Sequence, residues 1–275
     1  IAPAGTTTTA ALDGLTIEGG FGSSGGAGLL VSGSPTLTNL IISDNASTVD
    51  NGGGLYLQSG DPGLSNVTFE GNSSAYCGGG MYVTGGTPTL SGVTFSSNST
   101  LNGPTMGYAG GGLCVEGISA PAGAALSHVT FSGNTSANYG GGMYVFYGDV
   151  ALSDVTFSAN AARSGGGGGM YAVYSVVSLT DVVFTDNTTV DGGRGAGMSL
   201  ELTSDTTLTN VTFSGNTTSG GTTADGGGLY MDAEGGSQRL TNVVFYGNSA
   251  AGNGGGMAVN SASPELTNVT FGSNT

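Results

Sequence analysis

The sequence predicts an all-β fold, a single-domain parallel β-helix (solenoid) of about ten rungs. Three observations predict it. One unit of sequence recurs along almost the whole chain, at intervals of 25 to 36 residues. Within each unit, apolar and polar residues alternate as they do in strands with one buried face. Every unit except the last also contains a run rich in glycine, which suits a sharp corner because glycine adopts positive φ without strain.

The first half of the unit predicts a strand that bends. Three residues after an opening leucine comes a Val or Leu column, and two residues later a column that holds eight of the ten phenylalanines. These two columns share one face of a strand, whereas the opening leucine has the opposite parity, so we expect a bend between them. The opening leucines are Leu12, Leu37, Leu64, Leu90, Leu126, Leu152, Leu179, Leu208, Leu240 and Leu266.

Asparagine recurs eight residues after the opening leucine in nine of the ten units. Asparagine side chains at equivalent turns of stacked rungs can bond to backbone groups and to one another. We therefore predict a buried structural ladder. Its members are Asn45, Asn72, Asn98, Asn134, Asn160, Asn187, Asn216, Asn248 and Asn274.

The second half of the unit predicts another strand. After the glycine run comes Leu or Met, then an outward position, then a further inward apolar residue. The outward position is tyrosine in five units, and we expect these rings to form an exposed column. Such a column can bind sugar rings or a partner protein, or it can be self-stacking that stabilises the sheet. The column consists of Tyr56, Tyr82, Tyr144, Tyr171 and Tyr230.

One unit cannot bury its apolar face alone, but stacked copies can. Because parallel crossovers are overwhelmingly right-handed, we expect a right-handed solenoid. Residues 1–11 would form an N-terminal arm, and residues 12–275 the β-helix with an incomplete last rung. Uncovered end rungs present free strand edges. We therefore expect either that the sequence is a fragment of a longer chain or that copies associate through the helix ends and build a filament, and we favour the filament.

The composition excludes several function classes. The chain has 3 Lys+Arg against 18 Asp+Glu and a formal net charge of −15, too few cations to neutralise a row of phosphates. We therefore expect no nucleic-acid partner. No apolar run approaches the roughly 20 residues of a transmembrane helix, so we expect no membrane span in this chain.

The repeated motif F-x-x-N, followed by two glycines, Ala or Gly, and then Ile, Leu or Met, resembles the repeats of chlamydial-type polymorphic outer-membrane proteins and related β-helix passengers. Phe69 to Asn72, then Gly78 to Met81, is one example. The resemblance covers about residues 12 to 275. Such proteins are surface-exposed and often adhesive. The resemblance implies an extracellular or cell-surface location and a structural or adhesive role, with a carbohydrate or cell-surface ligand.

Parallel β-helices also serve as polysaccharide lyases and hydrolases, so stacked carboxylates are the alternative candidates. Asp154 and Asp181 fall in one column, two residues after successive opening leucines. Adjacent-rung carboxylates about 5 Å apart can hold Ca²⁺ or act as a catalytic pair. The same column holds mostly Asn, and His128, so it can also be a corner that suits any short polar residue. We favour the corner, and hence no catalytic residue, no metal and no cofactor.

Cys77 and Cys114 lie on successive rungs but in different columns. A straight strand would separate these positions by roughly 16 Å. A disulfide spans only about 4.4 to 6.8 Å between Cα atoms. We therefore expect no bridge unless the turn before Gly78 folds back.

Asn-x-Ser/Thr sequons occur in two columns. Those in the asparagine ladder should be buried and unavailable to a glycosyltransferase. The outward corner column holds three candidate glycosylation sites, Asn66, Asn210 and Asn268. The longest loops, at 101–108, 116–125, 219–225 and 232–239, are where ligand binding on a rigid scaffold is expected.

Overall fold

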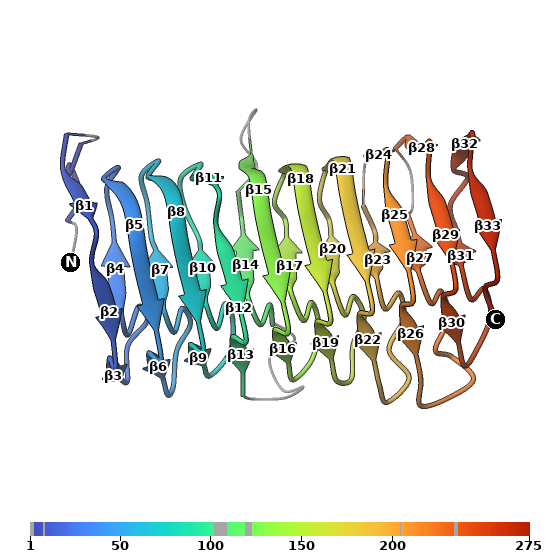
Figure 1. The fold of residues 1–275 in the computed structure, drawn as a ribbon, viewed down its shortest axis with the longest axis horizontal. Helices are drawn as coiled ribbons and strands as arrows, with labels where there is room; N and C mark the ends of the chain where they lie inside the picture. The colour runs from blue at the N-terminus through green and yellow to red at the C-terminus, as the bar shows by residue number, and fades with distance from the viewer. Residues whose placement is uncertain (1–2, 8, 102–108, 119–122, 204, 234–235) are drawn as a thin grey trace.

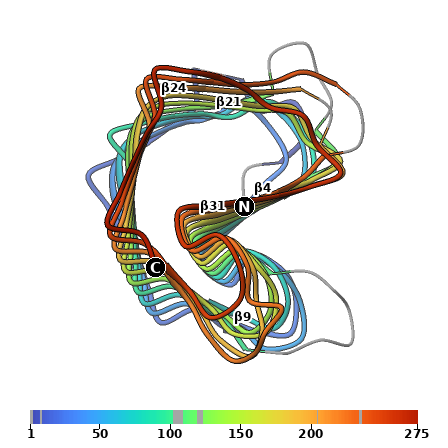
Figure 2. The same ribbon diagram turned by 90° about the vertical axis from the view of Figure 1, so that its right-hand side faces the viewer.

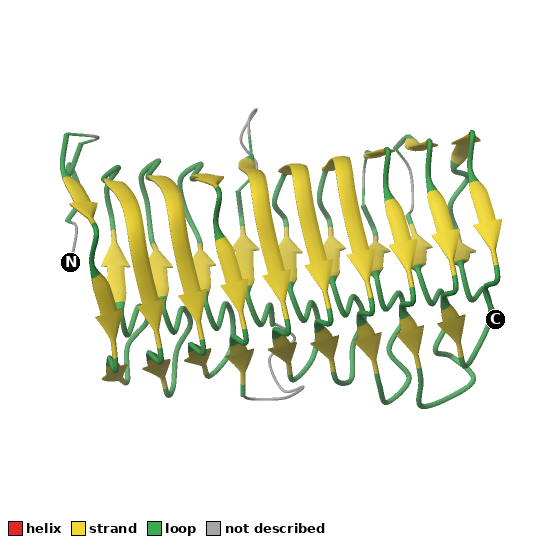
Figure 3. Ribbon diagram, viewed as in Figure 1, coloured by secondary structure: helices red, strands yellow, loops and turns green. Residues whose placement is uncertain are grey.

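The computed structural model describes residues 3–7, 9–101, 109–118, 123–203, 205–233 and 236–275. These residues form strands, turns and bends without any helix, and they wind into an elongated solenoid (Figure 1, Figure 3). Strands of consecutive rungs pair in parallel, so that three sheets run along the solenoid. The predicted all-β parallel β-helix is confirmed. Residues 102–108, 119–122 and 234–235 of the expected binding loops lie outside the described residues.

The first sheet contains the first half of every unit. Equivalent residues pair in register, as Leu126 with Leu152 and Phe131 with Phe157. In several rungs the strand is interrupted at the bend and forms two strands. The members are β1 (Ala11–Asp13), β2 (Thr16–Glu18), β5 (Thr36–Ser43), β8 (Gly63–Glu70), β11 (Thr89–Ser91), β12 (Thr94–Ser96), β15 (Ala124–Ser132), β18 (Val150–Ser158), β21 (Val177–Thr185), β24 (Thr206–Thr209), β25 (Thr212–Ser214), β28 (Gln238–Thr241), β29 (Val244–Tyr246), β32 (Glu265–Thr267) and β33 (Thr270–Gly272).

The second sheet follows the glycine run, and the third sheet consists of two-residue strands after the asparagine ladder. The second sheet comprises β4 (Leu29–Val31), β7 (Leu55–Leu57), β10 (Met81–Val83), β14 (Leu113–Glu116), β17 (Met143–Phe146), β20 (Met170–Val173), β23 (Met198–Glu201), β27 (Leu229–Asp232) and β31 (Met257–Asn260). The third sheet comprises β3 (Phe21–Gly22), β6 (Ala46–Ser47), β9 (Ser73–Ser74), β13 (Ser99–Thr100), β16 (Thr135–Ser136), β19 (Ala161–Ala162), β22 (Thr188–Thr189), β26 (Thr217–Thr218) and β30 (Ser249–Ala250).

The bend predicted in the first sheet is a single residue in the left-handed conformation. Two residues after every opening leucine, the backbone φ lies between 52° and 68°. Glycine, asparagine and aspartate enter this region most readily, because glycine has no Cβ and the other two can bond locally. We call these positions the corner column. It comprises Gly14, Asn39, Asn66, Gly92, His128, Asp154, Asp181, Asn210, Asn242 and Asn268.

The main core lies inside the solenoid and is continuous from rung to rung. The phenylalanines of the first-sheet column, from Phe69 to Phe245, have no exposed surface. Successive rings stack nearly parallel, with centroids 4.6 to 4.9 Å apart. Parallel pairing in register therefore turns one apolar column of the sequence into one aromatic stack.

The predicted asparagine ladder is confirmed. From Asn45 to Asn248, each Nδ2 donates to the Oδ1 of the next rung's asparagine, and the backbone N–H donates to the same oxygen. In Asn160 these two bonds to Asn187 are both 3.0 Å long. Each Nδ2 also donates to a carbonyl of the preceding rung, as Asn160 does to Phe131. The ladder is fully buried from Asn45 to Asn248.

The second sheet is covered on both faces. Viewed along the axis, the rungs superimpose on an indented outline, and the second sheet, from β4 to β31, lies at the indentation (Figure 2). The turns that lead from the third sheet to the second fold back over its outer face. A second buried cluster fills that space, made of Cys77, Tyr82, Cys114, Tyr144, Tyr171 and Val173. A position that faces away from the main core is therefore still an interior position here.

Candidate functional site

The tyrosine column is buried, so the prediction that it is exposed is wrong. Tyr82, Tyr144, Tyr171 and Tyr230 are only 3 to 6% exposed, and Tyr56 is partly exposed. The rings point away from the main core as expected, but the returning turns cover them. Tyr144 and Tyr171 stack at 5.6 Å, which is the self-stacking alternative. The four buried rings therefore present no open face to solvent.

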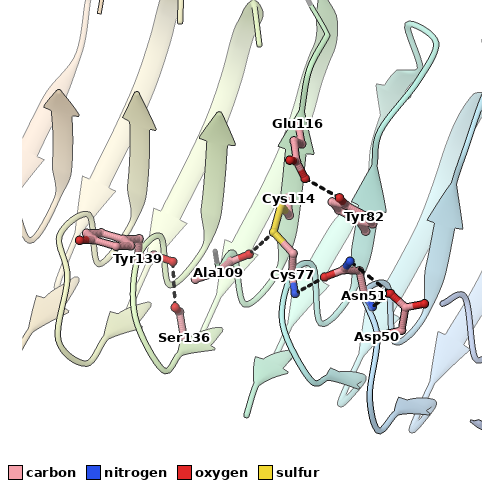
Figure 4. The surroundings of a disulfide bond; sticks show 9 residues. All are labelled: Asp50, Asn51, Cys77, Tyr82, Ala109, Cys114, Glu116, Ser136 and Tyr139. Atoms are coloured by element: carbon pink, nitrogen blue, oxygen red, sulfur yellow. Dashed lines mark hydrogen bonds between the residues drawn. A yellow bond between two sulfur atoms is a disulfide. The ribbon is translucent and has the colours of Figure 1, made fainter. Parts of the chain in front are cut away.

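Cys77 and Cys114 are bridged, which corrects the expectation drawn from a straight strand. Their Cα atoms are 5.7 Å apart, and the bridge lies on the outer face of the second sheet (Figure 4). The reason is the turn at Gly78, whose φ of +65° reverses the chain. The Cys77 N–H donates to Asn51 Oδ1 of the preceding rung at 2.8 Å, which fixes this reversal. Cys77 is thereby brought beside β14.

The stacked carboxylates lie at the corner of the first sheet. Asp154 and Asp181 have left-handed φ values of 52° and 56°. Asp154 Oδ2 lies 3.4 Å from His128 Nε2, and Asp181 Oδ1 accepts a hydrogen bond of 2.9 Å from Asn210. Both side chains thus belong to an exposed cross-rung ladder in the corner column. Among the described residues, no three His, Cys, Asp or Glu side chains gather into a group that could hold a metal.

The two sets of sequons differ in exposure as the sequence predicts. Asn66, Asn210 and Asn268 are exposed in the corner column. The sequon asparagines of the buried ladder have no exposed surface. Each of the three exposed amides donates to the preceding rung, as Asn66 does to Asn39 Oδ1 at 2.7 Å. Glycosylation of these three residues stays a prediction.

A cavity of about 310 Å³ opens beside the outer face of the second sheet. The sequence did not predict its residues as a site. Tyr139, Arg194, Glu201 and Thr223 line it, together with glycines of the returning turns. Two signals pointed there. Ser199 interrupts the tyrosine column between Tyr171 and Tyr230. Arg194 is one of only three cationic Lys or Arg side chains in the chain, and it stands inside a glycine run.

Burial and the Glu201 carboxylate keep two phenols at this cavity neutral. The Tyr171 hydroxyl donates to Glu201 Oε2 at 2.8 Å. Burial, and next to it the Glu201 carboxylate, raise the pKa of Tyr139 and of Tyr171. Both phenols therefore stay neutral at physiological pH, because burial and a neighbouring carboxylate disfavour a phenolate.

Arg194 is held against the next rung. Its Nε donates to the Thr223 carbonyl at 3.2 Å and its Nη1 to the Tyr230 hydroxyl at 3.0 Å. The guanidinium also lies over the Tyr230 ring, 4.8 Å from the centroid. A guanidinium held at three points is pre-organised to donate to a further group.

Comparisons with known proteins agree with this architecture. The family model described as "Right handed beta helix region" matches residues 5–188 and 114–275, which together span nearly the whole chain. The comparisons with curated proteins and with solved structures give no match. Within the described part of the chain, no helical segment has the length and apolarity that a membrane crossing requires.

Proposed function

The chain belongs to the right-handed β-helix family, and from that premise we propose that it is an extracellular, non-enzymatic scaffold with a structural or adhesive role. The family's fold is shared by adhesins and by polysaccharide-degrading enzymes. The choice between these classes depends on what the side chains of this particular solenoid do.

The observation that carries the proposal is the unbroken ladder from Asn45 to Asn274, beside the stacked phenylalanines. Every rung is bonded to its neighbour at the same buried points. At about 4.8 Å per rung, ten rungs make a rod roughly 48 Å long. A rod of this kind holds its surface in fixed positions, which is what a structural or adhesive element requires.

The corner column supports the same role. Asp154 and Asp181 occupy a backbone conformation that every rung adopts, whether the residue there is Gly, Asn, Asp or His. Backbone geometry therefore explains their presence without a catalytic task. Their oxygens are engaged with His128 and Asn210.

The proposed location has two supports. The Cys77–Cys114 bridge fits an oxidising compartment, since disulfides persist mainly outside the cytosol. The repeat motifs resemble those of chlamydial-type surface passengers, which are exposed and often adhesive. Association of copies through the helix ends stays a prediction, and electron microscopy of the purified protein would test it: filaments would support it and dispersed monomers would contradict it.

An activity assay tests the non-enzymatic role. The wild type is incubated with neutral and acidic polysaccharides, and new reducing ends or unsaturated products are measured. We expect none. Turnover that either Asp154→Ala or Asp181→Ala abolishes would establish the polysaccharide-degrading alternative. Asn242→Ala, a change at the same corner position without loss of a carboxylate, is the matched control and would leave such turnover intact.

A further inference from the structure

One rung departs from the pattern of the tyrosine column next to the cavity, where β20, β23 and β27 pair. Tyr171, Ser199 and Tyr230 are register partners, so the column of rings loses one member at Ser199. The returning turn lies close to the serine: a Cβ on Gly166 would be only 3.0 Å from Ser199 Oγ. That oxygen is buried and has no hydrogen-bond partner among the described residues. The gap in the column is thus bordered by backbone and polar side chains.

Two opposite charges face this cavity without pairing. Glu201 and Arg194 both line it, yet the structure records no ion pair between them. The other two arginines do pair with carboxylates, Arg163 with Asp191 and Arg239 with Glu265. Arg194 has no carboxylate within 4.0 Å in the part of the chain that the structure describes, and its Nη2 has no partner there. In a chain with a net charge of −15, an arginine left out of the ion pairs is available to a ligand.

The arrangement of groups selects the chemistry of that ligand. The carboxylate accepts hydrogen bonds and the guanidinium donates them. The partly exposed Tyr139, whose ring also packs against Tyr171 at 4.5 Å, adds aromatic surface. Vicinal hydroxyls and the C–H face of a pyranose use all three. The volume of about 310 Å³ lies at the lower end of ligand pockets, enough for one sugar unit.

The surrounding charge argues against an acidic sugar. A second carboxylate, that of Asp232, is near the cavity in addition to Glu201. It accepts a hydrogen bond of 3.4 Å from the Tyr230 hydroxyl, to which Arg194 donates. With two carboxylates and one guanidinium in this region, its net charge is negative. An uncharged sugar gains the hydrogen bonds without that repulsion.

We propose that this cavity binds one neutral pyranose unit of a glycan, with Arg194 and Glu201 holding its hydroxyls and Tyr139 packing on its ring. The inference deepens the adhesive part of the proposed function and rests on it for the absence of turnover. Ala109 and Gly166 occupy the column of Arg194 in other rungs. The repeat therefore folds without an arginine side chain at this position.

Isothermal titration calorimetry tests the site with neutral oligosaccharides of glucose, galactose, mannose and N-acetylglucosamine, and with oligogalacturonate as the acidic probe. We expect at least one neutral probe to bind, and the acidic probe to bind at least about tenfold more weakly. Arg194→Ala and Glu201→Gln should each weaken binding about tenfold or more, because each removes a charge-assisted hydrogen bond. Circular dichroism confirms that each variant folds.

Arg239→Ala and Glu265→Gln are the matched controls, since they make the same chemical changes in an exposed pair outside the cavity. Both should bind as the wild type does. Binding that survives both Arg194→Ala and Glu201→Gln, equal affinity for oligogalacturonate, or no binding of any neutral probe would overturn the inference. These outcomes leave the scaffold role untouched, whereas release of products from a bound glycan would refute the non-enzymatic role even if the site is correct.

Discussion

Two ladders of side-chain amides run along this solenoid, one buried at the turn between the first and third sheets and one exposed in the corner column. In the buried ladder each asparagine bonds to two other rungs, and the residue type never changes from Asn45 to Asn274. In the exposed ladder one amide reaches one neighbour, as Asn242 Nδ2 reaches Asn210 Oδ1 at 3.0 Å. There Gly, Asp and His replace asparagine. Asparagine serves through its side-chain hydrogen bonds in the buried ladder. In the corner column it serves through its tolerance of the left-handed backbone conformation.

Removing one amide from the buried ladder should have the largest effect. Asn160→Ala leaves the backbone N–H of Asn134 without its acceptor and its Nδ2 with one bond fewer, and the Phe131 carbonyl loses a donor. Each buried polar group left unpaired costs about 1–3 kcal/mol, so we expect a loss of about 3 kcal/mol or more in the free energy of unfolding. Urea denaturation measures it. A loss under about 1 kcal/mol would mean that the ladder is not what holds the rungs together.

The corner column should respond to backbone conformation and hardly to the amide. Asn242 has φ +55°, which alanine adopts at a cost of about 1 kcal/mol, so Asn242→Ala should lose about that much. Asn242→Gly should stay within about 0.5 kcal/mol of the wild type, because Gly92 already occupies this column. Equal losses for the two variants, in the same denaturation assay, would show that the exposed amide bond matters after all.

A charged contact between rungs should have the smallest effect. The Asp61 carboxylate accepts hydrogen bonds from the Thr87 N–H at 2.7 Å and from its hydroxyl at 2.9 Å. The Thr87 backbone N–H, above all, lowers the pKa of Asp61 below its ordinary 3.8. The ionised Asp61 carboxylate therefore stabilises the folded protein fully above pH 3.8. This contribution is lost as the pH falls through the lower pKa of the folded state.

Asp61→Asn tests this contact. Because the carboxylate is exposed and screened, the loss at pH 7 should be less than about 1 kcal/mol. The difference from the wild type should shrink when the pH is lowered from 7 to a value below the pKa of Asp61 in the folded state, where the wild-type residue is also uncharged. A difference that is the same at both pH values would show that the charge of Asp61 contributes nothing.

The sequence predicts the features of the fold that recur from rung to rung. The phenylalanine stack, the buried ladder and the bend at the corner column recur in nearly every unit, so comparing the units shows what each position must do. The change of parity after the opening leucine predicted a bend that the structure places at one left-handed residue, such as Asn66.

What the sequence did not predict depends on the turns, which differ from rung to rung. Alternation showed that Tyr144 and Tyr171 face away from the main core, but not that a turn covers them. The distance along a straight strand separated Cys77 from Cys114, whereas the turn at Gly78 brings them together. That Arg194 and Glu201 line one cavity likewise depends on a turn, because Arg194 lies in the turn that leads into β23 and Glu201 at the end of that strand.

The cross-link between the third and fourth rungs affects how the molecule responds to force. In a solenoid each rung contacts only its neighbours, so a molecule pulled by its two ends yields one rung after another. The bridge closes a loop of sequence separation 37, and those residues cannot extend while it is intact. At about 3.5 Å per residue, the oxidised chain would reach roughly 130 Å less far than the reduced chain. Under load, the rungs on either side of the bridge would unfold and extend, whereas the segment between Cys77 and Cys114 would not.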